Sequence, residues 1–201
     1  LDLSSLIYKI NDHNICIDVP FNEWHYVLGI DVGYHDQTAF CLTAYSPYFP
    51  QVFIERCEGF SEMIPSEIAE YVRMIMEEYE PTNIVMDTGG LGKSIAEELR
   101  KRYHVPIKPA EKQHKMANIE LFNGDLKDGK ILINPECQEL INQMKTLTRA
   151  DNGLEDPTKL NDLCDSSLYS WREAKHYCYQ EPAPRIERGS KQEIDLFWQS
   201  Q

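Results

Sequence analysis

Three runs of apolar residues near the start of the chain predict neighbouring strands. Residues 26–32 form a continuous apolar run, residues 38–45 form a second, and residues 51–58 alternate between apolar and polar positions. The connection from Gly33 to Gln37 has the length of a hairpin loop. These segments predict an antiparallel meander of three strands.

The hydrophobic period then becomes that of helices. Apolar residues from Ile68 to Tyr79 recur at spacings of three and four, and Pro65 suits a first helical turn. After Pro81 the pattern predicts further strands and helices in alternation. These are strands at 83–87, 105–107 and within 129–133, helices at 93–103, 112–127, 135–147 and 159–178, and a loop at 149–158.

This order of elements predicts an α/β fold, in which a mixed sheet is flanked by helices. The chain has 201 residues, enough for one full-sized domain. We expect that domain at residues 25–179. Residues 1–24 are interpreted as a lead-in or linker, with a possible short strand at 15–19, and residues 180–201 as a loose polar tail. Within the tail, Leu196-Phe197-Trp198 is an apolar patch expected to dock on a partner.

Composition restricts the partners of the chain. The net charge of −13 makes it a poor generic partner for DNA, so binding needs a local basic surface or a larger protein. The best local cluster is Lys108, Lys112, His114 and Lys115, although a solvated helix start explains it equally well.

No apolar run approaches the roughly 18–20 residues that cross a bilayer. The chain begins at Leu1 rather than Met, which suggests a fragment or a processed chain.

The cysteine pattern favours a reducing compartment. The six cysteines are scattered and form no CxxC pair, which argues against a zinc knuckle. Several fall inside apolar runs, where buried free thiols are expected.

Two aspartates end predicted strands. Asp31 follows the run from Tyr26 to Ile30, and Asp87 follows Met86. A carboxylate at the end of a buried strand must be paired, solvated or bound to a cation. A turn or helix cap would also account for each residue alone, but adjacent strands would bring the two together.

Two further aspartates lie where the last helix should begin. Asp162 and Asp165 are one turn apart and share a face, with Tyr169, Arg172 and His176 on their side. The helix dipole alone favours acidic residues in a first turn, so these two need no further role. Together with Asp31 and Asp87, however, they make an all-oxygen pocket suited to two Mg²⁺ or Mn²⁺ ions. Two such ions can cleave a phosphodiester without a protein nucleophile.

The segment from Asp87 to Ser94 imitates a phosphate-binding P-loop. It lies between a strand and a helix and ends in Gly-Lys-Ser. The P-loop pattern requires glycine where Asp87 stands, and a carboxylate there would repel phosphate. We therefore reject a nucleotide site. The glycines would instead allow a nucleic-acid backbone to approach Asp87, with Lys93 as a further contact.

Three segments carry a family resemblance. They are Gly29-Ile30-Asp31-Val32-Gly33, the stretch Val85–Gly92, and Asn161–Tyr169, which is similar to a closing D-x-x-D-A-x-x-Y helix with Ser166 in place of alanine. Gly129–Pro135 matches a glycine-basic-apolar strand that precedes a helix. In this combination the chain resembles the nuclease domain of tailed-phage large terminase subunits, within the RNase H-like superfamily.

The resemblance implies cleavage of double-stranded concatemeric DNA during genome packaging. Asp31 would bridge two metal ions, Asp87 and Asp165 would each hold one, and Asp162 would bind directly or support Asp165. Lys93, Lys112 and Lys115 would contact DNA. The implied partners are double-stranded DNA, an upstream ATPase domain, the portal and the small terminase subunit. The implied location is the cytoplasm of the infected host, without a membrane.

Three other functions stay open at this point. A Holliday-junction resolvase carries a similar set of carboxylates, and only its substrate would differ. An ATPase fragment of the actin or hexokinase kind also places Gly-x-Asp-x-Gly on its first strand, but needs a second domain. An inactive RNase H-like module would serve as a docking platform.

Overall fold

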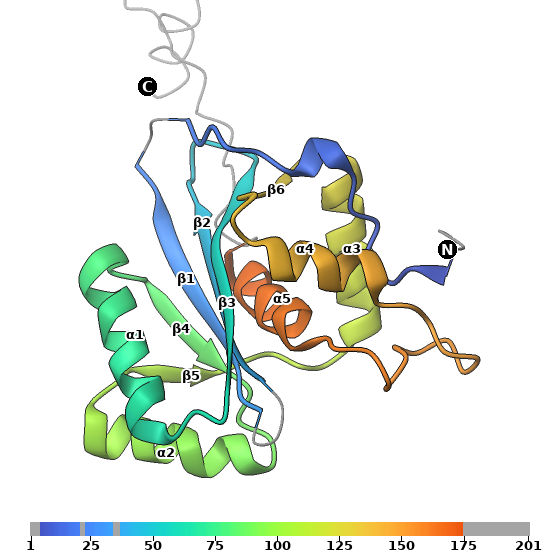
Figure 1. The fold of residues 1–201 in the computed structure, drawn as a ribbon. Coiled ribbons are helices and arrows are strands. Elements are labelled where there is room, and N and C mark those ends of the chain that lie inside the picture. Colours follow the sequence, from blue (N-terminus) through green and yellow to red (C-terminus); the bar gives the residue numbers. More distant parts are fainter. Residues whose placement is uncertain (1–4, 21–22, 34–36, 175–201) are drawn as a thin grey trace, which may run out of the picture.

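The computed structural model describes residues 5–20, 23–33 and 37–174. These residues form one mixed sheet with helices on both faces (Figure 1). In chain order, the strands are β1 (His25–Asp31), β2 (Gln37–Tyr45), β3 (Val52–Ser61), β4 (Asn83–Met86), β5 (Ile107–Pro109) and β6 (Ile131–Ile133).

The sheet has the order β5-β4-β1-β2-β3-β6. Strands β1, β2 and β3 form the expected antiparallel meander. Strand β4 then adds parallel to β1, β5 parallel to β4, and β6 parallel to β3. The predicted fold class, a mixed sheet that begins with three antiparallel strands, is confirmed.

The helices divide between the two faces of the sheet. Helices α1 (Pro65–Tyr79) and α2 (Leu91–Tyr103) cover one face, and α3 (Lys115–Lys127), α4 (Gln138–Thr146) and α5 (Asp162–Ala174) cover the other (Figure 1). Each helix group shares its own apolar cluster with the sheet. All the predicted helices are present. The largest differences at their starts are in α3, α4 and α5, each of which begins three residues later than expected.

The segment before β1 packs into the core. Ile7 and Tyr8 are fully buried. Asn14 ends a short 3-10 helix (Asp12–Asn14), and its Nδ2 donates hydrogen bonds to the carbonyls of Leu126 and Ile131 at 2.8 and 3.1 Å. The short strand expected at 15–19 is wrong, because the described residues there form a single bridge, Ile15 to Ile133. The domain boundary at residue 25 stays a prediction.

Four cysteines are buried free thiols, as expected: Cys41, Cys57, Cys137 and Cys164. His176, the tail at 180–201 and its Leu196-Phe197-Trp198 patch lie outside the described residues.

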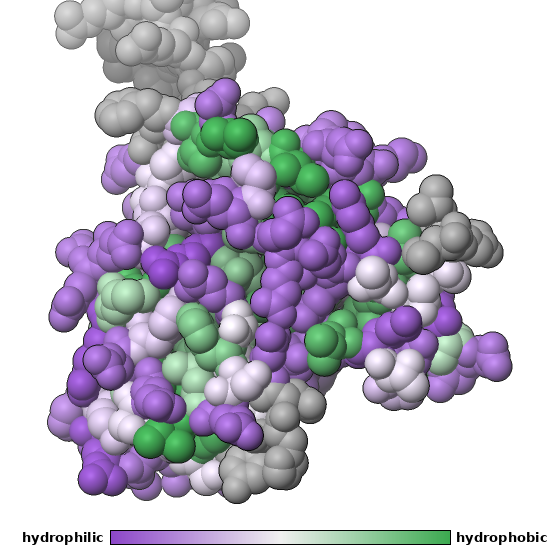
Figure 2. All heavy atoms as spheres, viewed as in Figure 1, coloured by the Kyte–Doolittle hydropathy of each residue, from purple (hydrophilic) through white to green (hydrophobic). Residues whose placement is uncertain are grey.

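The face of the molecule drawn in Figure 2 is largely hydrophilic, in keeping with the charge of −13. Apolar residues on this face lie in several separate groups, one of them over the α1 side at lower left. A hollow of about 380 Å³ lies between the end of β3 and α1 and is lined by Phe60, Met63, Glu67, Glu70, Tyr71 and Met74. Among the described helices, none is both long and apolar enough to span a membrane.

Candidate metal centre

Strand alternation directs Asp31 and Asp87 to the same face of the sheet. On β1, Leu28 and Ile30 belong to the cluster beneath α1 and α2, whereas Val27 belongs to the cluster beneath α5. On β4, Val85 likewise faces α5. Because successive side chains point to opposite faces, Asp31 and Asp87 both lie on the α5 side.

Parallel pairing places these two aspartates side by side. Ile30 is opposite Met86, and the Asp87 amide donates to the carbonyl of Ile30 at 3.2 Å. Asp31 and Asp87 are the next residues along the chain. Both therefore lie at the carboxyl ends of adjacent parallel strands, where ligands commonly bind in open α/β sheets.

Helix α5 brings the third carboxylate to this edge. The helix lies directly on β1, because Gly29 has no side chain and the carbonyl of Ser166 occupies the space where a Cβ would stand. One turn further on, the Ser170 hydroxyl hydrogen-bonds the Thr43 hydroxyl at 2.7 Å. This packing fixes the start of α5, and with it Asp165, above Asp31.

The three aspartates line one cavity of about 250 Å³. Tyr169 and Arg172, which the helical spacing placed on the aspartate side, line it too. The full lining is Asp31, Asp87, Lys112, Lys115, Asp165, Leu168, Tyr169 and Arg172. The structure thus brings together three of the four predicted metal ligands and two of the predicted DNA-contacting lysines.

The other expected residues lie outside this lining. Asp162 is half-buried on α5, and its charge still acts on Asp31. Lys93 is exposed on the first turn of α2. Lys108, part of the basic cluster, instead donates a hydrogen bond to the side chain of Asn83.

The pKa values of several groups in the cavity are raised by burial and by the neighbouring carboxylates. Burial, followed by the charges of the other three aspartates, raises the pKa of Asp31 to about 8. Burial also raises the pKa of Asp165 to about 6, although Lys115 opposes the shift. Burial and the neighbouring carboxylates raise the pKa of Tyr169 as well. Asp31 is therefore largely protonated at neutral pH in the metal-free site, and a bound cation would favour its ionised form.

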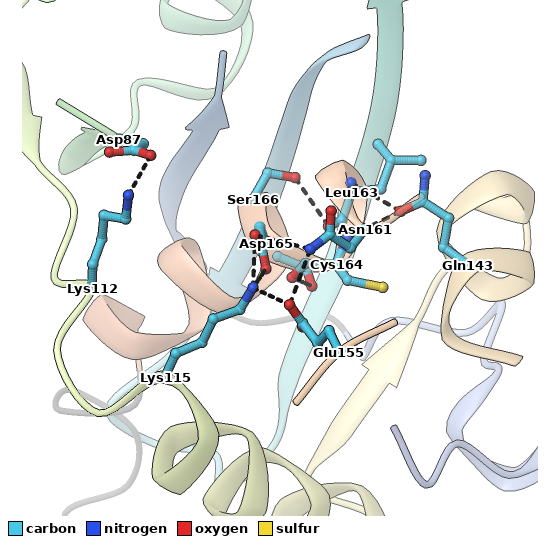
Figure 3. Close-up of polar contacts among 11 residues, drawn as sticks. Asp87, Lys112, Lys115, Gln143, Glu155, Asn161, Leu163, Cys164, Asp165 and Ser166 are labelled. Carbon is cyan, nitrogen blue, oxygen red and sulfur yellow. Dashed lines mark hydrogen bonds and ion pairs between the residues drawn. The ribbon is translucent and has the colours of Figure 1, made fainter. Parts of the chain in front are cut away.

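Two lysines from one segment partly supply that positive charge (Figure 3). Lys112 Nζ lies 2.6 Å from Asp87 Oδ2. Lys115 Nζ lies 2.6 Å from Asp165 Oδ1 and 2.6 Å from Glu155 Oε2. Sequence reasoning missed Glu155, because it lies in a loop with no periodic pattern and meets the site only through tertiary contact.

The glycine-rich loop after β4 turns tightly on Asp87. The Gly89 amide donates to Asp87 Oδ1 at 2.7 Å. A Cβ on Gly92 would lie 2.1 Å from the carbonyl oxygen of Asp87. The loop therefore directs a backbone N–H at a carboxylate, where a P-loop would direct it at phosphate.

The donor set fits divalent cations that prefer oxygen. Asp31, Asp87 and Asp165 offer carboxylate oxygens at one cavity, and burial together with repulsion between these carboxylates raises the pKa of Asp31. Among the described residues, no three acidic, imidazole or thiol side chains are grouped closely enough to form a ready-made metal site. In this arrangement two of the three aspartates form ion pairs: Asp87 with Lys112 and Asp165 with Lys115.

A known protein family matches most of this chain. The family model described as the terminase RNase H-like domain matches residues 28–173, which include all four aspartates. The chain belongs to this family. A comparison with curated proteins gave no match.

Solved structures of phage terminases share this fold. The nuclease domain of P22 large terminase is 14% identical with a TM-score of 0.67, covering 84% of this chain and 93% of that one. The large terminase nuclease of thermophilic phage G20c, described with bound magnesium, is 16% identical with a TM-score of 0.65 and coverages of 88% and 98%.

A longer relative is the large terminase of another thermophilic bacteriophage. It is 19% identical with a TM-score of 0.69, and the match covers 82% of this chain. The match spans 44% of that longer terminase, so this terminase domain corresponds to less than half of the relative.

Proposed function

We propose that this terminase domain is a divalent-metal-dependent endonuclease that cuts double-stranded viral DNA during genome packaging. The observation that carries the proposal is the meeting of Asp31, Asp87 and Asp165 in one cavity, at the ends of adjacent parallel strands and the start of a helix. The family assignment supports it, because the fold is that of terminase nuclease domains.

The aspartates would hold two Mg²⁺ or Mn²⁺ ions. Asp31 would be shared by both ions, while Asp87 and Asp165 would each hold one. Asp162 would bind directly or support Asp165. Bound ions of this kind stabilise the attacking and leaving oxygens of a phosphodiester. Related G20c nuclease structures are described with bound magnesium and with bound cobalt.

The remaining residues would prepare the cavity for DNA. Leu168 and Tyr169 line the cavity beside the aspartates. Arg172 also lines the cavity, with 8% of the residue exposed, and would place a positive charge beside a phosphate oxygen. Lys112, Lys115 and the more distant Lys93 would contact the DNA backbone.

The biological setting is part of the same proposal. The domain would act in the cytoplasm of the infected host as part of a larger protein that carries an ATPase domain. The portal and the small terminase subunit would be its assembly partners. The longer thermophilic-phage terminase, which is described in complex with ADP, supports the ATPase domain. A motor domain that holds DNA would also offset the acidic charge of this chain.

A plasmid assay tests the activity. Supercoiled plasmid is incubated with the domain in Mn²⁺, Mg²⁺ or EDTA, and nicked and linear products are quantified. We expect cutting with metal, none in EDTA, and a loss of at least about 100-fold in Asp31→Asn. Asp128→Asn, at an exposed position after α3, is the matched control. Absence of cutting with both metals, or an active Asp31→Asn, refutes the proposal.

A further inference from the structure

Lys115 is shared between two carboxylates of different elements. Its Nζ lies 2.6 Å from Asp165 Oδ1, 2.9 Å from Asp165 Oδ2 and 2.6 Å from Glu155 Oε2. The Asp165 and Glu155 side chains are 13% and 14% exposed. One ammonium group therefore lies against both oxygens of Asp165, the positions that a divalent cation would need.

Glu155 can accept a second hydrogen bond from Lys115. The Asn161 amide donates to Glu155 Oε2 at 3.1 Å and holds the carboxylate in place. Glu155 Oε1 is buried and has no hydrogen-bond partner among the described residues. Figure 3 shows Glu155 on the side of Lys115 away from Asp87. A small movement of Nζ toward Glu155 would fill that open acceptor.

Lys112 provides a contrast. Within the described part of the chain it pairs with Asp87 alone, at 2.6 Å, and its side chain is 51% exposed. Solvent can stabilise this ammonium when it leaves Asp87, so it needs no second partner. Lys115 is 31% exposed and lies between side chains that are mostly buried. A charge in such a position is costly to leave unpaired.

We propose that Glu155 is a positioning residue: it holds Lys115 beside Asp165 in the metal-free site and receives Lys115 when a divalent cation binds Asp165. The inference rests on the proposed function, because it concerns how the site takes up metal. A lysine carries three N–H donors, so it can leave Asp165 and keep its charge paired through both oxygens of Glu155. Without Glu155, Lys115 has only Asp165 and must compete with the cation.

A double-mutant cycle on Mn²⁺ affinity tests this relationship. Isothermal titration gives the Mn²⁺ Kd of the wild type, Glu155→Gln, Lys115→Met and the double variant. We expect Glu155→Gln to weaken binding about three- to tenfold, the range of a partly shielded charge pair, and Lys115→Met to tighten it. In the Lys115→Met background, Glu155→Gln should change the Kd less than about twofold.

Matched variants keep the test specific. Glu120→Gln removes another glutamate held 2.6 Å from a cation, Arg149, outside the cavity, and should leave the Mn²⁺ Kd unchanged. If Lys115→Met does not fold, Lys115→Gln, which keeps hydrogen-bonding capacity, replaces it in the cycle.

Each adverse result has its own meaning. If Glu155 itself binds the ion, Glu155→Gln weakens binding equally in both backgrounds, and the inference is overturned. An unchanged Kd in Glu155→Gln overturns it as well. A wild-type domain that binds no Mn²⁺ refutes the proposed metal site, and the inference falls with it. The wild-type titration alone identifies that case.

Discussion

Gly29 on β1 and Ser166 on α5 are in such close contact that a Cβ on Gly29 would lie 2.2 Å from the Ser166 carbonyl oxygen. This contact sets the height of α5 above the sheet. Asp31 is two residues after Gly29, and Asp165 immediately precedes Ser166. The same contact therefore determines how far apart two of the proposed metal ligands lie.

Gly29→Ala should destabilise the domain by at least about 2 kcal/mol, because the extra methyl meets backbone that has little room to move. Urea unfolding followed by circular dichroism measures the change. The control is Gly124→Ala in α3, where nothing lies within 4 Å of an added Cβ. Gly124→Ala should raise the free energy of unfolding by about 0.5–1 kcal/mol. Equal stabilities for the two variants would contradict the close packing.

Asp31→Asn should make the metal-free domain more stable at alkaline pH. The pKa of Asp31 is raised from 3.8 to about 8 in the fold, so between these values the folded state holds a proton that the unfolded state releases. Stability therefore falls as pH rises through this window, and asparagine removes that loss. Urea unfolding in EDTA at pH 5.5 and 8.5 should show a variant-minus-wild-type difference that grows by on the order of 2 kcal/mol. A difference that is independent of pH would refute the shifted carboxyl.

Asn14→Ala should lower the free energy of unfolding by about 2–3 kcal/mol, because the buried carbonyl groups of Leu126 and Ile131 lose their hydrogen-bond donor. Thermal melting of the metal-free domain checks this expectation. If Asn14→Ala leaves the melting temperature unchanged, the segment before β1 contributes little to stability and behaves as a linker, as the sequence pattern suggested. A large loss of stability would show that the segment before β1 folds together with the rest of the domain.

Lys112→Gln should change stability by less than about 1 kcal/mol, since its pair with Asp87 is half exposed. It should tighten Mn²⁺ binding about two- to threefold, because a competing cation is removed from Asp87. The control is Lys101→Gln, which breaks an exposed ion pair with Glu97 on α2. Weaker Mn²⁺ binding in Lys112→Gln would show that Lys112 positions Asp87 for metal.

Local patterns in the amino-acid sequence were enough to predict the order of the elements and the proposed metal ligands. Strand and helix periods differ, so the meander, the alternating β and α segments and the strand-end aspartates could be recognised locally. The face of α5 that carries Asp165, Tyr169 and Arg172 also followed from helical spacing. Residues 15–19 were expected as a strand because they alternate, but a strand needs a partner along its length and finds only Ile133 among the described residues.

Which charged side chains come into contact depends on tertiary packing and could not be predicted locally. Asp31 and Asp87 are 56 positions apart, and parallel pairing of their strands places them together. Glu155 carries no local signal at all. It joins the site because its loop passes beside Asp165, where Lys115 connects the two carboxylates. Periodicity reports which face of an element is buried, whereas the energy of a buried charge depends on neighbours that are remote in sequence.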